Sequence, residues 1–303
     1  MIDTVAVDAA LAGSGQGYVD HWYTSADGLR LYARDYPGPE ESELLPVLCM
    51  HGLTRNSADF AWIAGQLAAT RRVISVDQRG RGRSQYDPVP TNYKPETYVG
   101  DMFKLLDDLA LSRLILIGTS LGGLMAMLMA NMQPERCAAI VINDIGPELD
   151  PVGLDRIKNY VGKSRDIRSW DDAVAQTREI NETAFPKYSD DEWLRFTHGL
   201  YHETNGVPEL AYDAAISKPF LEDESNAVPP DLWPLFENML SIPLLLVRGE
   251  LSDILALDCV ERMQSMAPDM QFAQIPDRGH APMLDEPQAV SAINAFFAGI
   301  DQR

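Results

Sequence analysis

The stretch Gly-Thr-Ser-Leu-Gly-Gly at residues 118–123 stands between an apolar run at residues 112–117 and a run of helix formers at residues 124–130. The sequence therefore predicts a strand, a tight turn and a helix, with Ser120 at the tip of the turn. Glycines at positions 118 and 122 suit this turn, because a Cβ atom would clash where the strand and the helix approach each other. The start of the helix also directs N–H groups toward the serine, so an oxyanion formed there would have donors nearby.

Outward from this turn, short apolar runs alternate with segments whose apolar residues have helical spacing. Apolar runs at residues 47–50, 73–76 and 138–142 predict buried strands, and helical spacing occurs at residues 57–69 and 96–110. Such alternation predicts a parallel sheet with right-handed crossovers, in which ligands bind beyond the carboxyl ends of the strands. The polar residues expected at that edge are His51 with Gly52, Asp77, Ser120, and Asn143 with Asp144.

The alternation of strands and helices stops between about residues 146 and 235. Strand-like segments resume with the apolar run at residues 243–247 and with residues 270–275. The intervening segment is helical in pattern, charged and rich in aromatic residues, and it contains no apolar strand. We expect a core made of residues 21–145 and 236–303, an inserted helical cap at residues 146–235 over the active edge, and an N-terminal leader at residues 1–20. The aromatic residues either line an apolar pocket or form the core of the cap itself.

The bulk composition is that of an ordinary globular protein, with 303 residues of which 46% are hydrophobic. The formal net charge of −20 disfavours nucleic acids and anionic membranes as partners, and weakly disfavours anionic substrates. The first twelve residues lack a basic residue, and no apolar run approaches the roughly 18 residues of a membrane span. Three cysteines at positions 49, 137 and 259 are expected to be buried and free. These observations predict a soluble cytoplasmic protein without a signal peptide.

A serine hydroxyl becomes a nucleophile at neutral pH when a base accepts its proton and an acid orients that base. His280 is the expected base, because it lies in a loop after the last predicted strand, at the active edge. Two residues can supply the acid: Asp253 follows the strand at residues 243–247, and Asp144 follows the strand at residues 138–142. The chain order serine, Asp253, His280 matches one known arrangement of a catalytic triad.

The other histidines are weaker candidates for the catalytic base. His198 and His202 are four residues apart on a predicted cap helix, which is a spacing that metal ligands use. The segment lacks the glutamate of a His-Glu-x-x-His motif, so we predict no metal site and no cofactor. His51 is expected to matter for the backbone of its loop, and His21 for the outer hairpin that residues 21–34 predict around an Asp-Gly pair.

Together these segments resemble the α/β-hydrolase superfamily from about residue 20 onward. The residues that carry the resemblance are His51 with Gly52, the loop at residues 77–84, the turn at residues 118–123, residues 249–253, and Gly279 with His280. The resemblance implies an α/β-hydrolase fold, with a mostly parallel eight-stranded sheet flanked by helices and an inserted helical cap. It also implies that the arginines at positions 79, 81 and 83 are structural.

The resemblance assigns chemical roles as well. It implies that Ser120 is the nucleophile, His280 the base and Asp253 the acid, and that the backbone N–H groups of Leu53 and Leu121 form the oxyanion hole. The expected activity is hydrolysis of a carboxylic ester or lactone of a small, largely apolar substrate through an acyl-enzyme intermediate. The alternatives are a C–C bond hydrolase of ring-fission diketo products, which uses the same triad, and a non-catalytic ligand receptor on the same fold. The sequence does not indicate the oligomeric state.

Overall fold

The computed structural model describes residues 17–219 and 231–302. Most of the leader predicted at residues 1–20 therefore lies outside the described residues, as do residues 220–230 of the predicted cap. Among the described residues, no helix is both long enough and apolar enough to cross a membrane. The three cysteines are buried and free.

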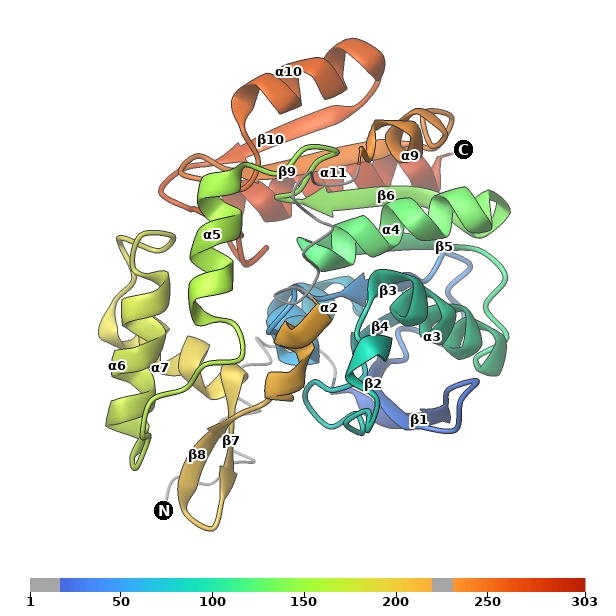
Figure 1. Cartoon of the computed structure of the whole chain (residues 1–303). Helices are drawn as coiled ribbons and strands as arrows, with labels where there is room; N and C mark the ends of the chain where they lie inside the picture. Colours follow the sequence, from blue (N-terminus) through green and yellow to red (C-terminus); the bar gives the residue numbers. More distant parts are fainter. Residues whose placement is uncertain (1–16, 220–230, 303) are drawn as a thin grey trace.

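The centre of the molecule is an eight-stranded sheet with the strand order β1-β2-β4-β3-β5-β6-β9-β10 (Figure 1). Strand β2 is antiparallel to both of its neighbours, and every other pair in the sheet is parallel. The mostly parallel eight-stranded sheet predicted from the sequence is thus confirmed. Its strands are β1 (Val19–Thr24), β2 (Arg30–Tyr36), β3 (Val47–Met50), β4 (Val73–Asp77), β5 (Leu114–Thr119), β6 (Cys137–Asn143), β9 (Leu244–Gly249) and β10 (Gln271–Ile275).

Helices cover both faces of this sheet, which explains why the inner strands are apolar throughout. Along β5, Leu116 packs into the cluster on one face, whereas Ile115 and Ile117 pack into the cluster on the other. Strand side chains alternate between faces, so a strand buried on both sides has no position for a solvated residue. One face carries α3 (Pro95–Asp108), α4 (Leu121–Met132), α9 (Trp233–Glu237) and α10 (Leu257–Met266), and the other carries α2 (Ala61–Leu67) and α11 (Pro287–Asp301).

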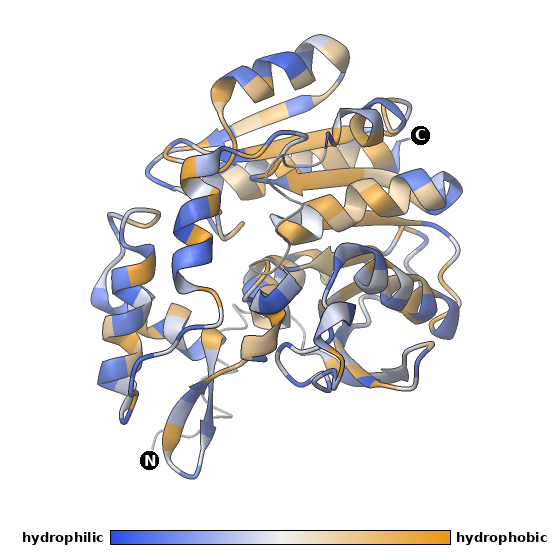
Figure 2. Ribbon diagram, in the orientation of Figure 1, coloured by the Kyte–Doolittle hydropathy of each residue, from blue (hydrophilic) through white to orange (hydrophobic). Residues whose placement is uncertain are grey.

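After β6 the chain leaves the sheet, and the elements from α5 to β8 lie on the side of the carboxyl ends of the strands (Figure 1), whereas α9, just before β9, packs on a face of the sheet. In Figure 2 the strands of the sheet are mainly hydrophobic, whereas α5 and α6 carry many hydrophilic residues. The elements of this segment are α5 (Pro151–Tyr160), α6 (Trp170–Asn181), α7 (Asp190–Leu200), β7 (Tyr201–Thr204), β8 (Val207–Leu210) and the short helix η4 (Ala214–Ser217). The further short helices are η1 (Ser57–Phe60), η2 (Pro90–Asn92) and η3 (Pro134–Arg136). The limits of the cap as a domain remain a prediction.

One part of the cap differs from the helical structure predicted for it. Strands β7 and β8 form an antiparallel hairpin that is separate from the main sheet. Its turn is Asn205-Gly206, and both residues have positive φ, at 53° and 84°. An Asn-Gly pair with this geometry matches the right-handed twist of a two-residue hairpin. The pair was the sequence signal for a hairpin, and no apolar run accompanied it because both strands are partly exposed.

Candidate active site

The turn between β5 and α4 presents Ser120 in an unusual backbone conformation. Its φ is 52° and its ψ is −116°, a conformation that residues with a side chain seldom adopt. The flanking glycines have the steric role that the sequence predicted. A Cβ atom added to Gly118 would lie 2.2 Å from the carbonyl oxygen of Gly122, and one added to Gly122 would lie 1.9 Å from the carbonyl oxygen of Met50.

The packing at Gly122 gives a stability prediction. Gly122→Ala should lower the free energy of unfolding by about 3 kcal/mol or more, because β3 and α4 must separate to admit the methyl group. Urea denaturation measures this change. Gly100→Ala in α3 is the matched control: its added Cβ meets nothing within 4 Å, and we expect it to be neutral or stabilising by up to about 1 kcal/mol. Equal stability of Gly122→Ala and the wild type would contradict the steric argument.

A chain of hydrogen bonds links Ser120, His280 and Asp144. The Ser120 Oγ is 2.8 Å from His280 Nε2, and His280 Nδ1 is 2.8 Å from Asp144 Oδ2. His280 lies in the loop between β10 and α11, and the three residues follow three different strands at the same edge of the sheet. With the Nδ1–H donated to the carboxylate, Nε2 is free to accept the serine proton.

Asp144 is held in place by more than the histidine. Its side chain is fully buried, its Oδ1 accepts a hydrogen bond from the N–H of Gly249 at 2.8 Å, and its Oδ2 accepts one from Ser252 Oγ at 2.7 Å. The backbone of Asp144 has φ 58°, which turns the chain sharply as it leaves β6. Three donors therefore fix a buried carboxylate in the orientation that faces His280.

The structure does not bring Asp253 to His280, which corrects the expectation that it supplies the acid. Its carboxylate instead binds the guanidinium of Arg156 in α5, with Oδ2 at 2.5 Å from Nε and Oδ1 at 2.8 Å from Nη2. Burial alone would raise the pKa of Asp253, but the hydrogen bonds and charge of Arg156 hold it below its ordinary value. The loop after β9 aims Ser252, and not Asp253, at the site, so Asp144 occupies the position beside the histidine.

The two backbone groups predicted for the oxyanion hole lie on either side of Ser120. Leu121 follows it at the start of α4, and Leu53 follows Gly52, where an added Cβ would lie 3.6 Å from the Ser120 Cβ. Within residues 17–219 and 231–302, neither the Leu53 nor the Leu121 N–H donates a hydrogen bond to the protein. Their assignment to an oxyanion hole remains a prediction.

Buried side chains fix the loop that carries Leu53. His51 is fully buried, with Nδ1 2.7 Å from the Gly52 carbonyl oxygen and Nε2 accepting from the Gln78 N–H at 3.1 Å. Burial lowers the pKa of His51 to about 3, so the imidazole is neutral and serves as a structural link. Arg81, which is also fully buried, donates from Nε to the Leu53 carbonyl oxygen at 2.9 Å.

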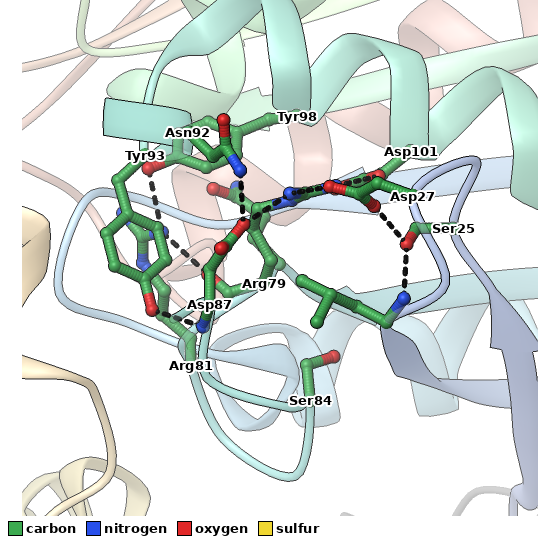
Figure 3. A network of polar contacts seen from close by, with 12 residues as sticks. Ser25, Asp27, Arg79, Arg81, Ser84, Asp87, Asn92, Tyr93, Tyr98 and Asp101 are labelled. Carbon is green, nitrogen blue, oxygen red and sulfur yellow. Dashed lines mark hydrogen bonds and ion pairs between the residues drawn. The ribbon is translucent and has the colours of Figure 1, made fainter. Parts of the chain in front are cut away.

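Figure 3 shows the network of polar contacts in which Arg81 and its neighbour Arg79 lie. Arg79 binds three carboxylates, those of Asp27, Asp87 and Asp101, at 2.6–2.8 Å. Its guanidinium lowers the pKa of Asp27 to about 2, chiefly through hydrogen bonds. Arg81 donates from Nη1 to the Arg79 carbonyl oxygen and to the Tyr98 hydroxyl. The network ties the loop after β4 to α3 and to the β1–β2 turn, and it is the support on which Arg81 holds Leu53.

A cavity opens in front of Ser120 and His280, between the sheet edge and the segment that follows β6. Its lining from the core includes Gly52, Leu53, Thr54, Arg55, Asp59, Phe60, Thr119, Ala281, Pro282 and Met283, and from the later segment Ile157, Tyr160, Lys163, Gln176, Thr177, Ile180, Asn181, Leu200, Tyr201, Leu210 and Tyr212. Apolar and polar side chains thus both face the space beside the serine.

The aromatic residues of the cap divide between the two roles that the sequence left open. Phe185, Tyr188, Trp193 and Phe196 pack against one another as a core of that segment, with ring centroids 4.6–6.3 Å apart. The aromatic residues that line the cavity from this segment are Tyr160, Tyr201 and Tyr212. Each of them carries a hydroxyl, so the aromatic residues make the cavity less apolar than expected.

The pair His198 and His202 does not have the helical spacing predicted for it. Helix α7 ends at Leu200, so His198 lies on the helix and His202 on β7. His198 packs against Trp170 with ring centroids 4.0 Å apart, and His202 Nε2 lies 3.7 Å from Glu209. Each ring has a different neighbour, and the two histidines do not face a common point.

Comparison with known proteins agrees with this architecture. A family model described as the alpha/beta hydrolase family matches residues 47–293. A structure of an alpha/beta hydrolase from Novosphingobium aromaticivorans is 41% identical, covers 94% of this chain and 99% of its own, and has a TM-score of 0.87. A 3-hydroxybutyrate-oligomer hydrolase of Cupriavidus necator is 29% identical over 277 residues, 89% of this chain and 93% of its own length. A 2-(acetamidomethylene)succinate hydrolase of Mesorhizobium japonicum is 27% identical over 234 residues, 77% of this chain and 81% of its own. The chain belongs to the alpha/beta hydrolase family.

Proposed function

We propose that this protein is a serine hydrolase that cleaves a carboxylic ester or lactone through an acyl-enzyme intermediate. Ser120 is the nucleophile, His280 the general base and Asp144 the acid that orients it, in place of Asp253. The observation that carries this proposal is the pair of 2.8 Å contacts that joins the serine through the imidazole to a buried carboxylate. The similarity to a 3-hydroxybutyrate-oligomer hydrolase supports an ester substrate, because units of a hydroxy acid are joined through ester bonds.

In the proposed reaction, each step is carried out by a named group. As Ser120 Oγ attacks the carbonyl carbon, its proton passes to His280 Nε2, and Asp144 stabilises the imidazolium that forms. The new oxyanion accepts hydrogen bonds from the N–H groups of Leu53 and Leu121. His280 then gives the proton to the departing alkoxide oxygen. A water molecule enters, loses a proton to His280, attacks the acyl carbon, and releases the acid with the proton returned to Ser120.

Labelling and turnover test this function together. The protein is incubated with a serine-reactive phosphonate and, separately, assayed with p-nitrophenyl esters, lactones and ring-fission diketo products. We expect hydrolysis of the esters or lactones, and one phosphonate bound per chain, at Ser120. Absence of labelling would favour a non-catalytic receptor. The C–C hydrolase alternative stays in the panel because Lys163 lines the cavity, and its ammonium suits a carboxylate of such a substrate.

Arg81 gives a prediction about the oxyanion loop. Arg81→Lys removes the Nε donor to the Leu53 carbonyl oxygen, so we expect kcat to fall by about 10-fold to 100-fold while KM stays within about threefold. Steady-state kinetics with a p-nitrophenyl ester measures both constants. A boronic acid that mimics the tetrahedral intermediate should also bind more weakly, whereas a general loss of structure would raise KM and lower the melting temperature.

Arg83→Lys is the control for this prediction. Arg83 lies in the same loop but is half exposed and pairs with Asp20 on the surface. Conservative replacement there should leave both kinetic constants unchanged. A similar loss of kcat in both variants would mean that the loop as a whole, and not the contact with Leu53, sets the rate.

We also propose that the protein acts in the cytoplasm on small molecules, with neither nucleic acid nor membrane as a partner. The three free and buried cysteines fit a reducing compartment. Fractionation of cells that express the full chain tests the location, and we expect the protein in the soluble fraction.

A further inference from the structure

The charge of the active-site cavity is opposite to that of the chain. The whole sequence has 45 acidic and 25 basic residues. Among the described residues that line the cavity, Arg55 and Lys163 are basic, and Asp59 is the single acidic residue. The side chains that line the cavity therefore carry one more positive than negative formal charge, unlike the chain as a whole.

Arg55 and Asp59 neutralise each other. The Arg55 Nε donates to Asp59 Oδ1 at 2.8 Å, and both side chains are mostly buried. The Arg55 guanidinium also lies 4.2 Å from the centre of the Phe196 ring and contacts the sulfur of Met283. These contacts hold Arg55 against the wall of the cavity, so the unbalanced charge belongs to Lys163.

Lys163 stands at a fixed turn after α5. Its N–H donates to the Tyr160 carbonyl oxygen at 3.0 Å, which closes the turn. The preceding Gly162 has φ 73°, and a Cβ atom there would lie 2.4 Å from Ser217 Oγ, so the backbone is packed closely against η4. Within the described part of the chain, the Lys163 ammonium has neither a hydrogen bond nor an ion pair with another residue. The backbone is anchored, whereas the charged end of the side chain is available to a ligand.

We propose that Lys163 binds a carboxylate at the end of the substrate remote from the scissile bond. The substrate class is then an ester that carries a free carboxylate, such as a monoester of a dicarboxylic acid or a short ester-linked chain of hydroxy acids. This inference rests on the proposed function and replaces the largely apolar substrate expected from the sequence. An ammonium on a flexible stem suits this role, because it can follow carboxylates at several distances from the ester.

The test compares esters that differ by one group. Mono-p-nitrophenyl succinate, glutarate and adipate are each paired with the p-nitrophenyl butanoate, pentanoate or hexanoate in which a methyl replaces the carboxylate. For at least one pair we expect Lys163→Met to lower kcat/KM of the carboxylate ester by about 10-fold, mainly through KM, and to leave the neutral ester within about twofold. Lys163→Arg should retain most of the wild-type selectivity. Lys187→Met is the control, since this exposed lysine pairs with Asp277 and does not line the cavity.

The outcomes separate this inference from the proposed function. If the neutral esters are hydrolysed but Lys163→Met changes no pair selectively, the carboxylate site is wrong and the hydrolase remains. If no ester is hydrolysed, the proposed function fails. The carboxylate site at Lys163 is then tested by binding measurements alone. Calorimetric titration of Ser120→Ala with the monoesters should then still show weaker binding when Lys163→Met is added. Equal binding with and without Lys163 would overturn the carboxylate site.

Discussion

Replacing Ser120 with alanine should lower kcat for ester hydrolysis by about 10⁴-fold to 10⁶-fold. The substitution removes the oxygen that His280 Nε2 contacts at 2.8 Å, so no acyl-enzyme can form. Substrate should still bind with nearly unchanged affinity, because the cavity walls and the N–H groups of Leu53 and Leu121 stay in place. Stopped assays at high enzyme concentration measure the residual rate, and calorimetry measures binding.

The backbone at Ser120 makes this variant informative about folding as well. Alanine at φ 52° keeps the same strain, so the melting temperature should change little. Ser164→Ala, at an exposed serine outside the cavity, should have wild-type kinetics. Phosphonate labelling should disappear in Ser120→Ala and persist in Ser164→Ala. Turnover by Ser120→Ala within about 10-fold of the wild type would exclude the serine as nucleophile.

The fold could be predicted because the signals for it are local. Apolar runs such as residues 114–117 are long enough for a strand and have no polar face, which requires a sheet covered on both sides. The turn at Ser120 was predictable for the same reason, since its glycines stand at fixed positions within six residues of chain, although the clash at Gly122 is with Met50 of β3. The position of His280 at the active edge of the sheet was predictable because the residue follows the last strand.

The carboxylate that pairs with His280, Asp144 or Asp253, could not be predicted from local signals of this kind. Strands β6 and β9 are neighbours, and Asn143 lies opposite Val247, so Asp144 and the loop of Asp253 reach the same edge of the sheet. The choice depends on side chains from elsewhere, because Arg156 in α5 binds one carboxylate and Ser252 orients the other. The charge of the cavity depends in the same way on Lys163, which reaches the site through packing of the cap and not through any motif.

Asp144→Asn should lower kcat by about 10³-fold to 10⁴-fold, whereas Asp253→Asn should change it by less than about fivefold. The Asp144 carboxylate accepts from His280 Nδ1, Ser252 and the Gly249 N–H, and an amide cannot accept all three bonds or stabilise the imidazolium. Asp253→Asn weakens a contact with Arg156 in α5, whose neighbour Ile157 lines the cavity. Its effect should therefore fall on KM or on stability. Steady-state kinetics of both variants with one p-nitrophenyl ester measures the difference.

Coupling to the serine distinguishes the two carboxylates most directly. If Asp144 acts through His280 on Ser120, then adding Asp144→Asn to Ser120→Ala should cost no further activity, because the oriented base no longer has a nucleophile to activate. A larger loss of kcat in Asp253→Asn than in Asp144→Asn would restore Asp253 as the acid. That result would require the loop after β9 to turn away from Arg156 when substrate binds, and the Arg156→Met variant would then keep or raise kcat, because Asp253 would no longer have to leave the guanidinium.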